Sequence, residues 1–397
     1  MRTIGTVVRG VRAPIIREGD NIARIAADSV IAAWNEAGIT PRDRDVVAVT
    51  ESVVARAQGN YATTAQIAED VRAKTGGGTV GVAFPILSRN RFSLLLRGMA
   101  MGCKKVVLLL SYPSDEVGNH LVDWDSLDAA GVNPYTDVLT LEQFRENFGH
   151  ILHPFTGVDY IDYYAELIRG AGAEVQILFG NRVQMLLDYT DTVITCDIHT
   201  RMRSKRLLRQ AGARVVLGLD DLLTESVDGS GYHPEYGLLG SNKATEETVK
   251  LFPRDCMAVA EELSALLSEA SGKHIEAMVY GDGAFKDPVG KIWELADPVV
   301  APGYTKGLSG TPNELKLKYL ADNEFADLSG DALKQAVSQR IREKSGESLV
   351  GKMTAEGTTP RRIPDLIGSL CDLTSGSGDK GTPIVYIQGY FDTYVNE

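Results

Sequence analysis

Residues 104–110, Lys104-Lys105-Val106-Val107-Leu108-Leu109-Leu110, form a short run that is continuously apolar after its two lysines. Four comparable runs lie at residues 79–84, 174–179, 191–196 and 213–218. The segments between most of these runs are long enough for a crossover helix, and strands buried on both faces read as continuous apolar runs. The pattern therefore predicts an α/β fold with a central parallel sheet covered by helices.

Further elements are predicted on either side of this region. Strands are expected at residues 3–12, 45–49, 274–280 and 383–389. Apolar residues recur at helical spacing from Ile22 to Trp34, and Gly38 marks the end of that helix. Helices are also expected at residues 246–270, 312–321, 331–344 and 363–372. The segments 50–59 and 226–245 are expected to be loops.

Composition narrows the class of protein. The 397 residues carry a formal net charge of −12, which argues against a nucleic-acid partner because binding phosphate backbones needs a concentrated positive surface. The four cysteines are widely spaced, as expected of reduced thiols. The run Val106–Leu110 is too short to cross a bilayer, and no signal peptide is recognised. We expect a soluble cytoplasmic protein without a membrane segment.

The sharpest local signal is the loop that precedes the last predicted strand. Its glycines can expose successive backbone N–H groups, and a lysine adds positive charge, so the loop can hold a phosphate. The candidate residues for binding a nucleotide are Gly376, Gly378, Asp379, Lys380, Gly381 and Thr382. A tight helix-to-strand turn is the alternative interpretation, and the order of residues is not that of a Walker A loop.

Two further segments offer oxygen ligands for a metal. Asp282 lies between Gly281 and Gly283 after a predicted strand, where it can approach Mg²⁺ or Mn²⁺ without steric obstruction. An ordinary Asp-Gly turn explains the same residues. Asp115 also follows a predicted strand and precedes Asn119 in a polar loop, which is a candidate for metal or substrate contact or for simple solvation.

A third segment combines an acid with an imidazole. Asp197 and His199 follow another predicted strand, ahead of a basic run that contains Arg201 and Lys205. This arrangement can bind a metal or a phosphate, and the basic run can equally be the solvated face of a helix.

Three of these segments together resemble the coenzyme F420-0:L-glutamate ligase family. The opening Pro14–Asp20, the strand Asp45–Thr50 and the ending Ala57-Gln58-Gly59 are similar to the family's "P-x-I-x-x-G-D … G-D-V-x-V … S-K-A-E-G" layout. Residues 366–385 resemble its "G-E-x-x-x-G-I-P-x-V-V" ending, and Tyr280–Gly283 resembles its metal-binding "T-D-T/S" loop. Arg56 stands where the family usually has lysine, and Gly283 where it has a hydroxyl residue.

The resemblance implies a division of the chain and a chemistry. Residues 1–60 and 275–397 are expected to form a ligase-like core, with an enlarged α/β region at 61–274. Family members use GTP and Mg²⁺ or Mn²⁺ to join L-glutamate to a small-molecule acid through an acyl phosphate, and they pair as homodimers. The resemblance implies the following roles: Asp282 and Arg56 in catalysis, Asp282 and Asp115 on metal, and Thr50, Ser52 and the 376–382 loop on nucleotide.

Three rival functions fit the same residues. A ligase acting on another acid, such as a folate, shares the mechanism and differs only in its acceptor pocket. A metal-dependent hydrolase or phosphatase can be built from the same aspartates. A non-catalytic binding protein on a ligase scaffold is the third alternative.

Overall fold

The computed structural model describes residues 3–283, 285–287, 291–293, 295–344, 348–355, 361–375 and 378–395. Within these ranges the fold is α/β, as predicted, and is built around three sheets. No helix in these ranges is both long and apolar enough to pass through a membrane.

A five-stranded sheet joins segments from the beginning, the middle and the end of the chain. Its strands, from one edge to the other, are β1 (Val7–Val11), β14 (Ile384–Gln388), β2 (Val46–Thr50), β12 (Glu276–Tyr280) and β13 (Gly303–Tyr304). β2 and β12 are parallel, whereas β14 is antiparallel to both β1 and β2. The four predicted strands outside the central region are therefore confirmed, with β13 added at the edge.

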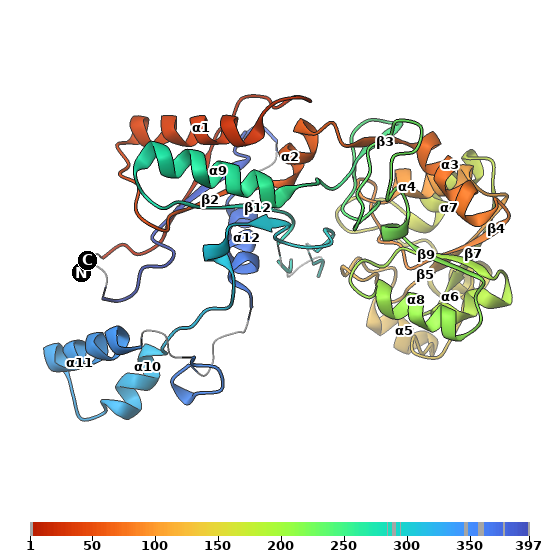
Figure 1. Ribbon diagram of the computed structural model, residues 1–397. Coiled ribbons are helices and arrows are strands. Elements are labelled where there is room, and N and C mark those ends of the chain that lie inside the picture. Colours follow the sequence, from red (N-terminus) through yellow and green to blue (C-terminus); the bar gives the residue numbers. More distant parts are fainter. Residues whose placement is uncertain are drawn as a thin grey trace.

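Helices cover both faces of this sheet (Figure 1). α1 (Ile22–Ala37) and α9 (Cys256–Ser271) lie on one face, and α12 (Ile363–Thr374) lies on the other. Successive strand residues point to opposite faces, so Val47 packs with α1 and α9 while Val46 packs with α12. This two-sided burial explains why the strand reads as an unbroken apolar run.

A six-stranded sheet forms the central region. In spatial order its strands are β6 (Leu139–Thr140), β7 (Glu174–Phe179), β5 (Lys105–Leu110), β4 (Thr79–Ala83), β8 (Thr192–Thr195) and β9 (Val215–Gly218). All pairings are parallel except that of β6 with β7. The five predicted strands are all present, and the order reverses direction at β4 and β8, as in doubly wound folds.

The helices of this region cover its sheet on two sides. Those present are α3 (Thr64–Thr75), α4 (Ser93–Met101), α5 (Trp124–Ala130), α6 (Leu141–Phe148), α7 (Tyr160–Gly170) and α8 (Arg201–Gln210). Residues of α3, α4 and α7 pack on the face that carries Val106 and Leu108, and Leu208 of α8 packs on the face that carries Val107.

Two predicted segments are corrected by the structure. The expected loop at 50–59 is largely the helix α2 (Glu51–Ala57). The expected helix at 246–270 begins late, because its first residues form β11 (Thr248–Lys250) and Pro253 follows, which disfavours a continuous helix. β11 pairs with β10 (Asn242–Lys243) and β3 (Tyr61–Thr63) in a small third sheet.

The segment before α12 forms a small cluster of its own, below the five-stranded sheet in Figure 1. It contains α10 (Leu317–Tyr319), the π-helix η4 (Leu320–Glu324) and α11 (Gly330–Glu343). Regular structure at the predicted helix 312–321 thus begins only at Leu317. The described ranges also contain the short 3₁₀ helices η1 (Val183–Asp188), η2 (Leu219–Asp221), η3 (Lys306–Leu308) and η5 (Met353–Ala355).

Candidate functional site

A pocket of about 620 Å³ lies at one edge of the five-stranded sheet, and we refer to it as the site pocket. Its lining residues come from both ends and from the middle of the chain: Ala13, Pro14, Ile15, Ile16, Thr50, Glu51, Ser52, Val53, Arg56, Arg91, Asn242, Tyr280, Asp282, Asp372, Ser375, Gly378, Gly381, Thr382 and Pro383. Seven of the residues predicted to function therefore meet in one place: Thr50, Ser52, Arg56, Asp282, Gly378, Gly381 and Thr382.

Sheet register explains this convergence. Thr50 and Tyr280 are partners at the carboxyl ends of the parallel strands β2 and β12, so the residues after each strand emerge side by side. β14 runs the other way, and the Thr50 backbone N–H donates to the Pro383 carbonyl at 3.0 Å. The loop before β14 therefore arrives at the same edge where β2 and β12 end.

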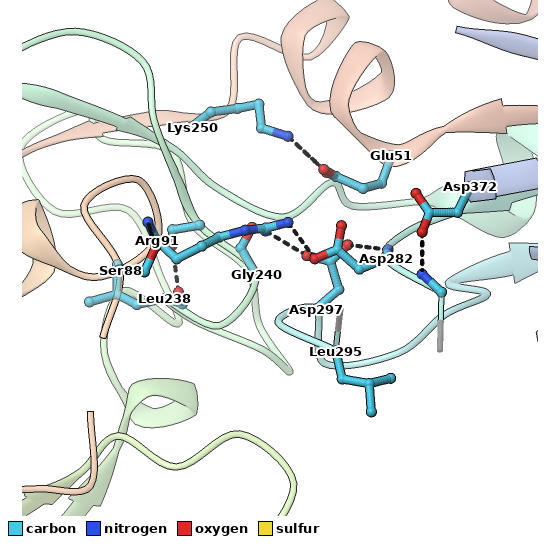
Figure 2. A network of polar contacts seen from close by, with 12 residues as sticks. Glu51, Ser88, Arg91, Leu238, Gly240, Lys250, Asp282, Leu295, Asp297 and Asp372 are labelled. Atoms are coloured by element: carbon cyan, nitrogen blue, oxygen red, sulfur yellow. Dashed lines mark hydrogen bonds and ion pairs between the residues drawn. The ribbon is translucent and has the colours of Figure 1, made fainter. Parts of the chain in front are cut away.

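Arg91 of the central region joins two aspartates of this edge (Figure 2). Its guanidinium donates to Asp282 Oδ2 at 2.5 Å and to Asp297 Oδ1 at 2.7 Å. Asp297 also accepts the backbone N–H of Asp282 through Oδ2 at 2.8 Å. The side chain of Asp297 is only 1% exposed, so Asp297 holds Asp282 and Arg91 in place without lining the pocket. Asp282 itself lines the pocket.

A second buried ion pair lies beside this network. Lys250 of β11 donates to both carboxylate oxygens of Glu51, at 2.8 and 2.9 Å. Glu51 is the first residue of α2 and lines the site pocket. A residue of the third sheet thus fixes a carboxylate at the end of β2.

The glycines on either side of Asp282 are needed because neighbouring groups approach closely. A Cβ on Gly283 would lie 2.7 Å from Ser369 Cα of α12, and a Cβ on Gly281 would lie 2.5 Å from Asp297 Oδ2. The Gly283 backbone N–H donates to Asp372 Oδ2 at 3.1 Å. The contact with α12 explains why glycine occupies the position where the family usually has a hydroxyl residue.

Burial and like charges disfavour ionisation in the site pocket. Burial, then the charge of Asp297, raises the pKa of Asp282 to about 7, although Arg91 acts in the opposite direction. Burial also raises the pKa of Asp372 and that of Glu51, in the latter case against the opposing charge of Lys250. Burial disfavours the charged Arg91, but the neighbouring acids outweigh this effect and raise its pKa.

The carboxylates of the site pocket suit a divalent metal ion that also keeps water or substrate phosphates as ligands. When ionised, four acids (Asp282, Asp297, Asp372 and Glu51) carry four negative charges. The positive charges of Arg91, Lys250 and Arg56 offset three of them, which leaves one negative charge. Mg²⁺ is commonly held by one or two carboxylates together with water and substrate phosphates. Asp282 and Asp372 both line the pocket and can supply those carboxylates.

Elsewhere in the described chain, three residues of the types that bind metals have their ligand atoms close together. They are His150, Asp159 and Asp162. Arg145 donates to Asp159 at 2.8 Å and to Asp162 at 2.7 Å, so it already offsets one of the two negative charges of these acids.

Several predicted residues lie outside the pocket lining. Asp115 accepts hydrogen bonds from the backbone of Leu87, Val117 and Asn119 and from the Asn119 side chain, at 2.7 to 3.1 Å, so it organises its own loop. Its metal role remains a prediction. Asp379 and Lys380 are exposed in the loop before β14. Gly376 lies outside the described residues.

The Asp197–His199 segment is engaged in local contacts. Asp197 accepts from the Thr200 and Ser204 hydroxyls, both at 2.7 Å. Of the basic run, Lys205 pairs with Asp220 at 2.6 Å. Arg201 pairs with the same aspartate at 3.2 Å, so these two cations of the run are already partnered.

Sequence reasoning missed most of the charged network. Glu51 lies in the segment after β2, and Asp372 is the last residue of the helix predicted at 363–372, so both positions could have been proposed from the sequence. No local sequence motif marks the other three members of the network, which are Arg91, Lys250 and Asp297. A polar residue at or near the end of a buried strand is the signal that identifies Glu51, as it identified Asp282.

The fold and the pocket define an α/β enzyme that acts on small molecules at a sheet edge rich in carboxylates and basic groups. The chain belongs to the F420-0:gamma-glutamyl ligase family, whose model matches residues 10–389. The family is one of ligases that form an amide bond in coenzyme F420 biosynthesis. No match is found among the curated proteins compared with the chain.

Proposed function

We propose that the protein is a GTP- and metal-dependent γ-glutamyl ligase that adds L-glutamate to a coenzyme F420-0-like acid at the site pocket. The observation that carries this proposal is the convergence of the family's opening, metal-loop and closing segments on one pocket, together with Asp372 and the Arg91 clamp. Family membership supports the ligase class.

The proposed reaction has two balanced steps. A carboxylate oxygen of the acceptor attacks the γ-phosphorus of GTP, which forms an acyl phosphate and releases GDP. The amine of L-glutamate, after losing a proton, then attacks the acyl carbon, which forms the amide and releases inorganic phosphate. The first step is needed because a carboxylate is a poor acylating agent at neutral pH.

Residues of the pocket are assigned roles by their charge and position. Asp282 and Asp372 would hold the divalent metal, which supplies neutralisation of phosphate oxygens and alignment of the transfer. The loop Gly378–Thr382 and Arg56 would face the anionic groups of the substrates. Arg56 is oriented for this by its hydrogen bond from Nε to the Ile16 carbonyl at 2.5 Å. Arg91 keeps Asp282 fixed without leaving its ion pair with Asp297.

Thermal unfolding tests nucleotide and metal binding together. A ligand that binds only the native state raises the unfolding temperature by mass action. We expect GTP with Mn²⁺ to raise it more than GTP or Mn²⁺ alone, and we expect this increment to be lost in Asp282→Asn. The increment, and not the absolute temperature, is compared because the substitution also changes stability. Absence of any increment with GTP or ATP would contradict the proposal.

Substrate scope and assembly are tested separately. Incubation with GTP, Mn²⁺ and L-glutamate should convert F420-0, and not a folate, into a product heavier by one glutamyl residue. Conversion of the folate but not of F420-0 would contradict the proposed acceptor and would indicate a ligase that acts on a different acid. We also propose a homodimer, as the resemblance implies, and light scattering should give twice the chain mass.

A further inference from the structure

The central region contributes two side chains to the lining of the site pocket, Arg91 and Asn242. The Arg91 guanidinium is occupied by its two aspartates and by the Gly240 carbonyl, to which it donates at 3.3 Å. Asn242 lies in β10 and is half-buried, so part of it is open to the pocket. Its side-chain amide makes no hydrogen bond to the described residues, which leaves one acceptor oxygen and two N–H donors for a substrate.

The backbone of Asn242 is held from two directions. β10 and β11 are antiparallel, and Asn242 lies directly opposite Lys250 in this pairing. The backbone N–H of the next residue, Lys243, donates to the Asn90 carbonyl at 2.7 Å. The amide is therefore presented to the pocket by a fixed backbone, which is what a substrate-binding residue requires.

The pairing with Lys250 determines the charge beside Asn242. Directly opposite residues of an antiparallel pair share one face of the sheet, with their Cβ atoms about 4.5–5.5 Å apart. Lys250 donates to both carboxylate oxygens of Glu51, so these two charges offset each other (Figure 2). This corner of the pocket is therefore close to neutral, whereas the metal end carries the acids Asp282 and Asp372.

A neutral corner with a free amide suits a zwitterion. The head group of an α-amino acid carries an ammonium and a carboxylate side by side, without net charge at neutral pH. One amide can satisfy both groups, because its oxygen accepts from the ammonium while its N–H donates to the carboxylate. Among the substrates of the proposed reaction, GTP and the acceptor acid are anions, and L-glutamate has such a head group.

We propose that Asn242 binds the α-amino acid head group of L-glutamate and thereby positions its amine for attack on the acyl phosphate. The inference rests on the ligase function proposed above. Oδ1 of Asn242 accepts from the amine, and Nδ2 donates to the α-carboxylate. Asn242 takes no proton in the reaction, and it makes the α-carboxylate a requirement for an efficient amine substrate.

Initial rates of amide formation test this role. Asn242→Ala should raise the KM for L-glutamate about tenfold, which corresponds to the loss of one hydrogen bond to a charged group, and should leave the KM for GTP unchanged. 4-Aminobutyrate is L-glutamate without its α-carboxylate, so it lacks the group that Nδ2 binds. The substitution should therefore lower kcat/KM much less for 4-aminobutyrate than for L-glutamate. Equal losses for the two amines, or an unchanged KM for L-glutamate, would overturn the proposal.

Two further variants separate binding from support of the fold. Asn242→Asp keeps the size and an acceptor oxygen but repels the α-carboxylate, so it should raise the KM for L-glutamate at least as much as alanine does. Recovery of the KM by aspartate would indicate a structural role and overturn the proposal. Asn147→Ala removes an exposed amide from α6 and should leave every KM unchanged.

Hydroxylamine distinguishes failure of this inference from failure of the ligase proposal. It attacks an acyl phosphate without an amino acid head group, which forms a hydroxamate and releases inorganic phosphate. With F420-0, GTP and Mn²⁺, the unchanged protein and Asn242→Ala should form hydroxamate at the same rate. A slower rate in the variant would overturn the role of Asn242 alone, whereas no hydroxamate with the unchanged protein would contradict the ligase function itself.

Discussion

Replacing Asp282 with asparagine should stabilise the folded protein at high pH while removing its activity. The carboxyl group is buried beside Asp297 and its pKa is raised to about 7 from an ordinary value of 3.8. Asparagine has the same shape without the charge, and its side-chain oxygen can still accept from Arg91. The native residue is therefore expected to cost stability in its ionised form, as functional groups often do.

The magnitude and its pH dependence follow from proton linkage. Between pH 3.8 and about 7 the folded state binds the Asp282 proton more tightly than the unfolded chain, so stability falls as pH rises through this window. One pKa unit corresponds to about 1.4 kcal/mol, so the full rise amounts to about 4 kcal/mol. Asp282→Asn should gain about that much at pH 8 and less than half of it at pH 5.

Urea denaturation of both proteins at pH 5 and pH 8 measures this difference. Asp159→Asn is the control of opposite sign, because hydrogen bonds and charge from Arg145 outweigh burial and lower the pKa of Asp159. That control should lose stability at pH 8, where the ionised carboxylate is fully partnered. A loss of stability in Asp282→Asn that is as large at pH 8 as at pH 5 would refute the reasoning. It would show that the charge of Asp282 supports the fold through Arg91.

Three further substitutions test the site. Lys250→Met should lower the free energy of unfolding by about 3–5 kcal/mol, since it leaves the charge of Glu51 buried and unpaired. The double variant Lys250→Met with Glu51→Gln should recover most of this loss. An absence of recovery would contradict the pairing of Lys250 with Glu51. Gly283→Ala should cost about 1–3 kcal/mol, because its Cβ would meet Ser369 Cα at 2.7 Å, and an unchanged urea midpoint would argue against that contact. Asp372→Asn should raise the Mn²⁺ concentration needed for the GTP-dependent thermal increment, and an unaltered Mn²⁺ dependence would remove Asp372 from the metal site.

The strands were predictable because their burial is visible in the residues themselves. β4, β5 and β7 lie inside a sheet covered on two sides, so each is a short continuous apolar run. The pocket was predictable in part for the same reason. Thr50 ends β2 and Asp282 follows β12, and because these strands are adjacent and parallel, both residues line the pocket at the same edge.

The other features of the fold and the site depend on tertiary contacts, which no local sequence pattern predicts. Arg91 reaches Asp282 across 191 residues of sequence, and Lys250 reaches Glu51 across 199. α2 was missed because a seven-residue helix spans only two turns and gives little periodic signal. The late start of α9 reflects pairing of β11 with β3, a tertiary contact that overrides helical spacing.

The most direct test of the ligase assignment follows the oxygen atoms of the acceptor. F420-0 that carries ¹⁸O in its acceptor carboxylate is incubated with the protein, GTP, Mn²⁺ and L-glutamate. The masses of the products are then measured by mass spectrometry. The account predicts one glutamyl product and one GDP for each phosphate released, with a single ¹⁸O transferred into that phosphate. Unlabelled phosphate, or GTP hydrolysis without a glutamyl product, would contradict it.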